Sequence, residues 1–292
     1  MSQKISKIVI PVAGVGTRGL PFTKEVPKEL LPIIDIPAIH FVVEEAVNSG
    51  ISQIVFVTAK GKSAIEDYFD YSPALEDFLR RCDKAQWADR LKQIAEMCDV
   101  ISVRQKKPLG LGHAVFCARN IVGREPFAVA LGDEIYPDWD NRTSALKQLT
   151  TSFDHLGTSV IGVKEVPIED TSKYGIVDPN PNSLADEPVR ISQAIEKPAP
   201  DKAPSCYAIT GRYVFESNIF EKINMITPGS GGEIQLTDAI DSLAKEGRMY
   251  AQRISAHRYD VGSQFSYVQA QIEFALRRSD LKEKMKQYLR EL

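Results

Sequence analysis

The chain has 292 residues, of which 43% are hydrophobic and 26% are charged. This composition is typical of a folded globular protein and excludes a disordered chain, a coiled coil and a collagen-like repeat. Because 36 Lys and Arg stand against 39 Asp and Glu, the formal net charge is −3. That balance excludes a protein that holds nucleic acid through bulk positive charge, although it allows a local basic pocket for a small phosphate.

The first 165 residues alternate between two hydrophobic patterns. Apolar runs predict strands at 5–12, 54–58, 100–103, 127–131 and 159–163. Apolar residues with helical spacing predict helices at 38–49, 62–69 and 112–119. Buried strands separated by helices favour an α/β fold with a doubly wound, mostly parallel (mixed) sheet flanked by helices.

Two further regions depart from this alternation. Residues 72–98 are helical in pattern and predict a helical insertion packed beside the sheet. After residue 166, the patterns predict strands at 189–195 and 207–215, an extended segment at 254–261, and helices at 233–245 and from 263 to about 289. We expect a single domain, 1–292, with a core at 5–165, a second part at 166–262 over the carboxyl edge of the sheet, and C-terminal helices at 263–292.

The sequence carries no evident targeting signal. No stretch reaches the roughly 20 apolar residues of a membrane span, and residues 1–7 lack the apolar region of a signal peptide. The four cysteines are scattered and form no Cys-x-x-Cys pair. We therefore expect reduced thiols and a cytoplasmic protein.

A glycine-rich loop follows the first predicted strand. Residues 12–19 read VAGVGTRG and contain a Gly-x-Gly-x-x-Gly pattern, which after a strand is typical of dinucleotide-binding dehydrogenases. That function requires a helix that starts at the third glycine. Prolines at 21, 27 and 32 prevent such a helix, so the dehydrogenase interpretation is rejected.

The same loop suits a different ligand. Its glycines allow the backbone to approach a ligand, and successive N–H groups can bind an anion. Arg18, Lys24 and Lys28 add positive charge within a stretch that prolines stiffen. These features favour a polyphosphate site, and the alternative is a cluster of solvated charges.

Several separated motifs resemble one family. The segments Gly14-x-Gly16-Thr17-Arg18-x-x-Pro21-x-Thr23-Lys24 and Pro27-Lys28-Glu29-Leu30-Leu31-Pro32 are similar to the signature of sugar-phosphate nucleotidylyltransferases. The whole set, from about residue 7 to 278, resembles the bacterial UTP–glucose-1-phosphate uridylyltransferases. The other motifs are VRQ at 103–105, GLGHA at 110–114, LGD at 131–133, YG at 174–175, IEKP at 195–198, GRY at 211–213, GEIQLTD at 232–238 and YDVG at 259–262.

The resemblance implies a fold, a reaction and a set of site residues. The fold would be a Rossmann-like nucleotidyltransferase core with a C-terminal sugar-binding part, assembled as a homodimer or homotetramer. The reaction would transfer UMP from UTP to glucose 1-phosphate, giving UDP-glucose and pyrophosphate. The nucleotide would contact Ala13, Gly14, Glu29, Gln105, Gly110 and Asp133; the sugar would contact Gly175, Glu196 and Gly211; and the catalytic charges would be Arg18, Lys28 and Lys197.

The residue types fit these roles. Arg and Lys bind phosphate oxygens, and the amide of Gln105 offers both a donor and an acceptor to a uracil edge. Asp133 follows a predicted strand, where ligands bind in parallel sheets. Since Mg²⁺ takes one or two carboxylates together with phosphates and water, Asp133 and Asp260 are the expected metal ligands, and the alternative is that each caps a turn. Strand alternation is expected to aim Glu134 elsewhere.

Other interpretations stay open at this point. The nucleotide can be dTTP or the sugar another hexose 1-phosphate, because a 5-methyl group on the base gives only about 1–3 kcal/mol of discrimination. A non-catalytic sensor of nucleotide sugars would keep the same pocket. His113 is expected to be a structural or capping residue rather than a general base. Gly19 and Gln264 depart from the family pattern, where a bulky apolar residue and a Lys are usual.

Overall fold

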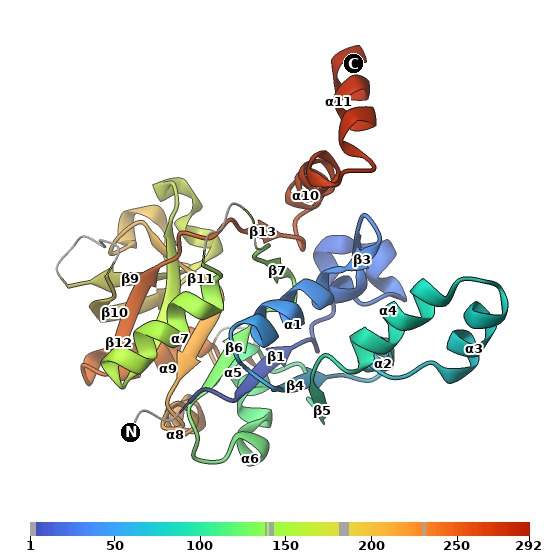
Figure 1. Cartoon of the computed structure of the whole chain (residues 1–292). Helices are drawn as coiled ribbons and strands as arrows, with labels where there is room; N and C mark the ends of the chain where they lie inside the picture. Colours follow the sequence, from blue (N-terminus) through green and yellow to red (C-terminus); the bar gives the residue numbers. More distant parts are fainter. Residues whose placement is uncertain (1–3, 138, 140–142, 181–186, 230–231) are drawn as a thin grey trace.

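The computed structural model describes residues 4–137, 139, 143–180, 187–229 and 232–292. In this described part, a nine-stranded sheet with the order β5-β4-β1-β6-β11-β8-β12-β10-β9 forms the centre (Figure 1). Its strands are β1 (Lys7–Pro11), β4 (Gln53–Thr58), β5 (Asp99–Arg104), β6 (Phe127–Ala130), β8 (Ser159–Glu165), β9 (Gly175–Pro179), β10 (Val189–Glu196), β11 (Tyr207–Phe215) and β12 (Met249–Arg253).

The sheet is mixed, as expected. Strand β1 is parallel to β4 and β6, and β4 is parallel to β5, so the half formed by the first 130 residues is parallel. Strand β11 is antiparallel to both β6 and β8, and β10 is antiparallel to β9 and β12. The carboxyl ends of β1, β4, β5 and β6 consequently meet at one edge, where ligands bind in sheets of this type.

Helices cover both faces of the sheet. Helices α1 (Ala38–Asn48) and α7 (Ala145–Leu156) pack on one face, and α5 (Leu111–Cys117), α8 (Ile219–Met225) and α9 (Leu236–Lys245) pack on the other. Successive side chains of β1 show the alternation that this layering requires: Ile8 and Ile10 belong to the core under α1, and Val9 belongs to the core under α5. The expected covered α/β sheet is confirmed.

The helical insertion is also confirmed. Helices α3 (Pro73–Arg81) and α4 (Ala85–Ala95) form a hairpin between α2 (Ser63–Asp67) and β5, and α4 buries Ala88 and Ile94. Helix α3 lies farther out and buries no residue (Figure 1). At the other end of the sequence, α10 (Gln264–Arg277) and α11 (Lys282–Glu291) extend away from the sheet. No described helix is both long and apolar enough to cross a membrane.

Three local differences from the sequence predictions bear on the site. Helix α9 begins at Leu236 rather than 233, because Gln235 is extended and the backbone of Ile234 hydrogen-bonds to Leu109 and Gly112. Strand β9, which begins at Gly175, and strand β12 were not predicted. The predicted extended segment at 254–261 contains only a two-residue strand, β13 (Tyr259–Asp260), which pairs antiparallel with β7 (Glu134–Ile135).

Candidate active site

A cleft of about 490 Å³ opens at the carboxyl edge of the parallel strands. The residues that the sequence singled out for the site line this cleft, except for Gly211 and for Lys24 of the basic loop. The lining residues are Ala13, Gly14, Arg18, Lys28, Glu29, Gln105, Gly110, Asp133, Gly175, Glu196, Lys197 and Asp260. The structure thus brings together segments from the whole length of the chain.

The loop after β1 has the form that the prolines predict. Between residues 17 and 30 it makes three short 3-10 turns, Thr17–Gly19, Phe22–Lys24 and Lys28–Leu30, and no α-helix. A Cβ atom on Gly14 would meet nothing within 4 Å, so the backbone at this position is open to the cleft. A phosphate group can therefore approach the main chain closely here.

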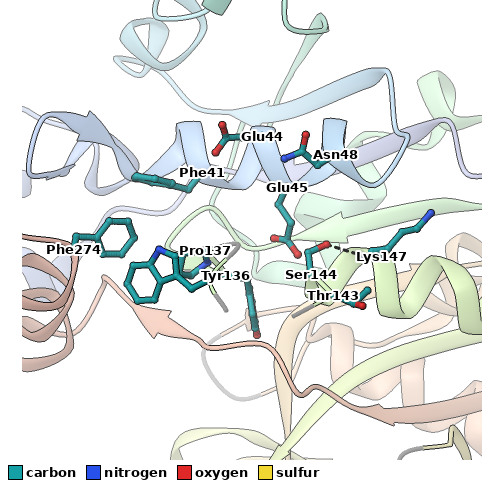
Figure 2. A pocket seen from close by; sticks show the side chains of 11 residues that line it. Phe41, Glu44, Glu45, Asn48, Tyr136, Pro137, Thr143, Ser144, Lys147 and Phe274 are labelled. Carbon is teal, nitrogen blue, oxygen red and sulfur yellow. Dashed lines mark hydrogen bonds between the residues drawn. The ribbon is translucent and has the colours of Figure 1, made fainter. Parts of the chain in front are cut away.

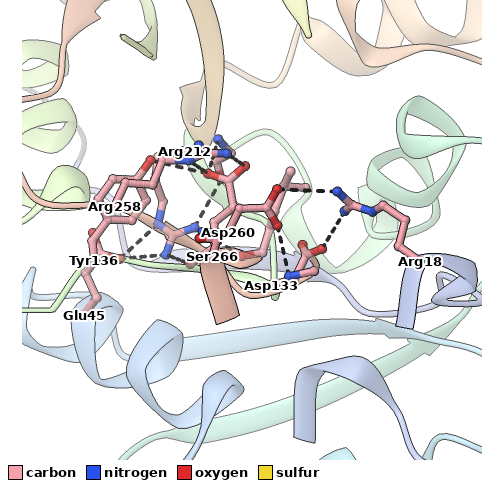
Figure 3. A network of polar contacts seen from close by, with 12 residues as sticks. Arg18, Glu45, Asp133, Tyr136, Arg212, Arg258, Asp260 and Ser266 are labelled. Carbon is pink, nitrogen blue, oxygen red and sulfur yellow. Dashed lines mark hydrogen bonds and ion pairs between the residues drawn. The ribbon is translucent and has the colours of Figure 1, made fainter. Parts of the chain in front are cut away.

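Two cations and two carboxylates meet beside this loop, and Figure 3 shows one of the cations, Arg18, facing Asp133 and Asp260. The guanidinium of Arg18 lies 3.3 Å from Asp133 Oδ2 and 3.4 Å from Asp260 Oδ2, and Lys28 Nζ donates to Asp133 Oδ2. The Arg18 side chain is 61% exposed, so its ion pairs are weak and can be exchanged for phosphate oxygens. The Lys28 side chain is mostly buried, which fixes its charge within the cleft.

Burial and charge act on these groups in opposite directions. Burial by itself would lower the pKa of Lys28, but the carboxylates of Asp133 and Glu29 outweigh it and hold the pKa above its usual value. The pKa of Asp260 is raised by burial and by the charge of Asp133, with Arg18 opposing the shift. The site therefore keeps Lys28 charged and places Asp260 where a further positive charge is favourable.

The two aspartates fit a divalent cation. Both converge on Gly262: a Cβ at that position would lie 2.7 Å from Asp133 Oδ2 and 3.1 Å from Asp260 Oδ1. Among the described residues, no group of three or more His, Cys, Asp or Glu side chains could hold a metal. A pair of carboxylates whose remaining ligands are phosphate and water is the arrangement that suits Mg²⁺.

Glu29 has a partner that the sequence analysis missed. Its carboxylate is almost fully buried and accepts a hydrogen bond of 3.0 Å from Lys62 Nζ, which comes from the turn after β4. Burial raises the pKa of Glu29, whereas Lys62 and Lys28 act in the opposite direction. Lys62 follows β4, the strand next to β1, so its position at the same edge of the sheet could have been inferred from the sequence.

The opposite wall carries the motif around Glu196. Strands β9 and β10 pair Gly175 with Glu196, and the Glu196 carboxylate accepts a 2.6 Å hydrogen bond from Thr237. A Cβ at Gly175 would lie 2.9 Å from the Thr237 hydroxyl, so only glycine fits without a shift. Lys197 follows in the left-handed region with φ 48°, and its N–H donates to the Tyr174 carbonyl.

Glu134 forms a buried ion pair with Arg258, which lies beside Asp260 (Figure 3). The Glu134 carboxylate is buried and accepts two hydrogen bonds from Arg258, at 2.7 and 2.8 Å, and one of 3.0 Å from the Gly211 N–H. Gly211 is therefore engaged with Glu134 and does not line the cleft. Arg258 does line it and was missed, although it stands two residues before Asp260 and thus has the same strand parity.

A second cavity of about 360 Å³ lies between α1 and α7 (Figure 2). The aromatic side chains of Phe41, Trp139 and Phe274 line it, together with Glu45 from α1. None of the residues predicted for the site reaches this cavity. The larger cleft is the candidate active site because the cations Arg18 and Lys28 and the paired carboxylates lie there.

The fold and the cleft define a nucleotidyltransferase. The chain matches the family model described as "Nucleotidyl transferase" over residues 7–276, and it belongs to this family. Two curated relatives from Bacillus subtilis (strain 168) are similar to it over nearly their whole length. One, a "UTP--glucose-1-phosphate uridylyltransferase", is 46% identical over 97% of this chain and 95% of its own. The other, "UTP--glucose-1-phosphate uridylyltransferase YngB", is 44% identical over 100% and 97%.

Solved structures agree with this assignment. A "UTP-bound UGPase" from Acinetobacter baumannii has a TM-score of 0.91 and 39% identity, covering 99% of each chain. A "UDP-glucose pyrophosphorylase complexed with UDP-glucose" has a TM-score of 0.84 and 39% identity, covering 94% of this chain and 100% of its own. The fold predicted from the sequence is confirmed, as is the predicted family.

Proposed function

We propose that the protein transfers UMP from UTP to glucose 1-phosphate and so produces UDP-glucose and pyrophosphate. One observation carries the proposal: a single cleft joins the cations Arg18 and Lys28 and the two aspartates to Gln105 on one side and Lys197 on the other. Relatives with this activity in their names are similar over nearly the full length. We also propose the homodimer or homotetramer, which the exposed Phe78, Trp87 and Phe265 on the outlying helices support.

The chemistry needs positioning and charge neutralisation more than proton transfer. A phosphate oxygen of glucose 1-phosphate forms a bond to the α-phosphorus of UTP while the bond to the β-phosphate oxygen breaks, and pyrophosphate leaves. The attacking oxygen is already anionic, so no general base and no covalent enzyme intermediate are required. In this proposal, Lys197 offsets the repulsion between the two phosphates, and Arg18 and Lys28 stabilise the departing pyrophosphate.

The remaining residues position the two substrates. Ala13, Gly14 and Glu29 face the nucleotide, with Gln105 and Gly110 against the base. Glu196 faces the sugar hydroxyls, with Gly175 beside it, while Gly211 supports this wall through Glu134. Asp133 and Asp260 would hold Mg²⁺, which when bound supplies positive charge to phosphate oxygens.

Pyrophosphate release from the purified protein tests the proposal. We expect turnover with glucose 1-phosphate and UTP in Mg²⁺, a weaker response to CTP, ATP and GTP, and loss of turnover in EDTA. Asp133→Asn should lower kcat/KM by about 10²- to 10³-fold, as for other groups that stabilise transition-state charge. Asp77→Asn, on the exposed face of α3, is the matched control and should retain activity.

Other outcomes of this assay would change the proposed activity. A preference for dTTP would keep the reaction type and change the nucleotide. Tight binding of UDP-glucose without turnover in Mg²⁺ would contradict the enzyme assignment and favour a sensor of nucleotide sugars.

A further inference from the structure

The amide of Gln105 is held by two neighbours at the edge of the cleft. Its nitrogen, Nε2, lies 3.2 Å from the Gly110 carbonyl oxygen and 3.0 Å from Nδ1 of His113. A carbonyl oxygen can only accept hydrogen bonds, so the amide group must turn its nitrogen towards Gly110. With both hydrogens of the amide engaged, Oε1 is the remaining polar atom of this side chain for a ligand in the cleft.

The Gly110 carbonyl is itself held in place by backbone contacts. Gly110 has φ 92°, and a Cβ there would lie 2.7 Å from the Ile234 carbonyl oxygen, so the loop packs directly on the segment before α9. Ile234 donates its N–H to the Leu109 carbonyl and accepts from the Gly112 N–H. The position of the Gly110 acceptor is thus set by the fold.

The contact with His113 fixes the state of the imidazole. Because Gln105 Nε2 is a donor, Nδ1 must accept, which leaves the ring proton on Nε2. The thiol of Cys117 lies 3.9 Å from the same Nδ1 and is compatible with an acceptor there. Burial, and to a smaller extent Arg119, lowers the pKa of His113, which favours the neutral ring that this contact requires.

We infer that His113 is a positioning residue that fixes the Gln105 amide with Oε1 towards the base, so that the site accepts bases with an N–H donor at that edge. This inference rests on the proposed function and deepens it. Uracil and thymine carry such a donor at N3, whereas cytosine presents an acceptor there and would face Oε1 with a second acceptor. This arrangement of acceptors discriminates UTP from CTP, and it does not discriminate UTP from dTTP.

A matched pair of variants at position 113 tests this inference. Oδ1 of Asn is the same number of bonds away from the backbone as Nδ1 of His. The His113→Asn variant therefore keeps a hydrogen-bond acceptor for Gln105. Leu has nearly the same shape as Asn but no acceptor, so His113→Leu frees the amide to rotate. His113 is only half-buried, so both substitutions are compatible with folding. Thermal denaturation of each variant verifies that it is folded.

The readout is the ratio of kcat/KM for UTP to that for CTP, with dTTP as an internal control. We expect His113→Leu to lower the UTP-to-CTP ratio about tenfold, the equivalent of ~1.4 kcal/mol and of one lost hydrogen bond. The UTP-to-dTTP ratio should stay unchanged, and His113→Asn should behave as the wild type. An unchanged UTP-to-CTP ratio in a folded Leu variant, or equal losses with both nucleotides, would overturn the inference.

Two further measurements separate this inference from the proposed function. If the wild type releases no pyrophosphate from any nucleotide, the proposed function fails, and calorimetric binding of UDP and CDP to the same variants still tests His113. The tautomer provides a measurement on the unmodified protein. A long-range ¹H–¹⁵N spectrum should show the proton of His113 on Nε2, and a proton on Nδ1 would contradict the inference.

Discussion

At the scale of single residues, Lys197 shows how the cleft stores strain next to its chemistry. A non-glycine residue in the left-handed region costs about 1–3 kcal/mol and persists where surrounding contacts impose it. Here the N–H of Lys197 donates to the Tyr174 carbonyl, and Pro198 follows. These constraints fix the backbone at Lys197, and its Nζ lies 3.5 Å from Glu196 Oε1 on the same wall of the cleft.

Removing that charge should impair the reaction more than it impairs folding. We expect Lys197→Met, which keeps the aliphatic chain, to lower kcat/KM by about 10²-fold, within the ~2–4 kcal/mol typical of a preorganised charge. The KM for glucose 1-phosphate should rise as well. Lys202→Met, on an exposed turn nearby, is the control. A Lys197 variant with the activity of this control would remove Lys197 from the catalytic set.

The sequence predicted residues that directly follow strands better than residues that pair with buried carboxylates. Motif residues such as Asp133 and Lys197 follow strands, so their positions at the sheet edge could be inferred from strand order. Lys62 and Arg258 act through buried partners, Glu29 and Glu134. Glu29 and Lys62 are 33 residues apart, and Glu134 and Arg258 are 124 residues apart. Ion pairs at such separations produce no periodic pattern in a single sequence.

At the scale of elements, the strands in the two halves of the sheet differ in how easily they are recognised from the sequence. The central strands of the first half, β1, β4 and β6, are buried on both faces, so they appear as continuous apolar runs that are easily recognised. Strand β12 (MYAQR) mixes apolar and polar residues, and its pairing with β8 supplies the order that its own sequence does not indicate. Helix α9 starts late because the backbone of Ile234 makes its hydrogen bonds to Leu109 and Gly112 instead of within the helix.

Packing between α1 and α2 makes the stability sensitive to acid. His40 of α1 is buried, and its Nδ1 lies 3.1 Å from the hydroxyl of Tyr68, the residue that ends α2. Burial, and secondarily Arg90, lowers the pKa of His40 from 6.5 to about 4. The folded state therefore favours the neutral ring, so its contribution is fully present above pH 6.5 and is lost as the pH falls towards 4.

We expect this group to remove about 3 kcal/mol from the free energy of unfolding between pH 7 and pH 4. His40→Asn keeps a hydrogen-bond acceptor for Tyr68 and does not titrate, so it should lack this part of the pH dependence. Urea denaturation of both proteins at the two pH values gives the difference, in which the other titrating groups cancel. Parallel pH dependences of the two proteins would show that His40 titrates normally.

At the scale of the whole molecule, one buried ion pair connects the helical layer to the centre of the sheet. Arg212 of β11 is fully buried and donates two hydrogen bonds, of 2.9 and 2.8 Å, to Glu45 Oε2 of α1. Glu45 Oε1 accepts from the backbone N–H of Leu146 in α7. Arg212 also donates to the carbonyl oxygens of Leu131 and Glu134, which flank Asp133 (Figure 3).

Breaking this pair should therefore affect both stability and the segment around Asp133. Loss of one partner leaves a buried charge unpaired, and we expect Arg212→Met or Glu45→Leu to lower the free energy of unfolding by about 3–5 kcal/mol. The double variant leaves no unpaired charge, so its cost should be smaller than the sum of the single costs by about 1–3 kcal/mol. The double variant should not return to wild-type stability, because the carbonyl oxygens of Leu131 and Glu134 and the Leu146 N–H would each lose a hydrogen bond. Urea denaturation of the four proteins measures the coupling, and strictly additive costs would show that the two side chains act independently.

Activity measured on the folded double variant would then show whether the contacts of Arg212 with the carbonyl oxygens of Leu131 and Glu134 hold Asp133 in its working position, with a fall in kcat/KM as the expected result.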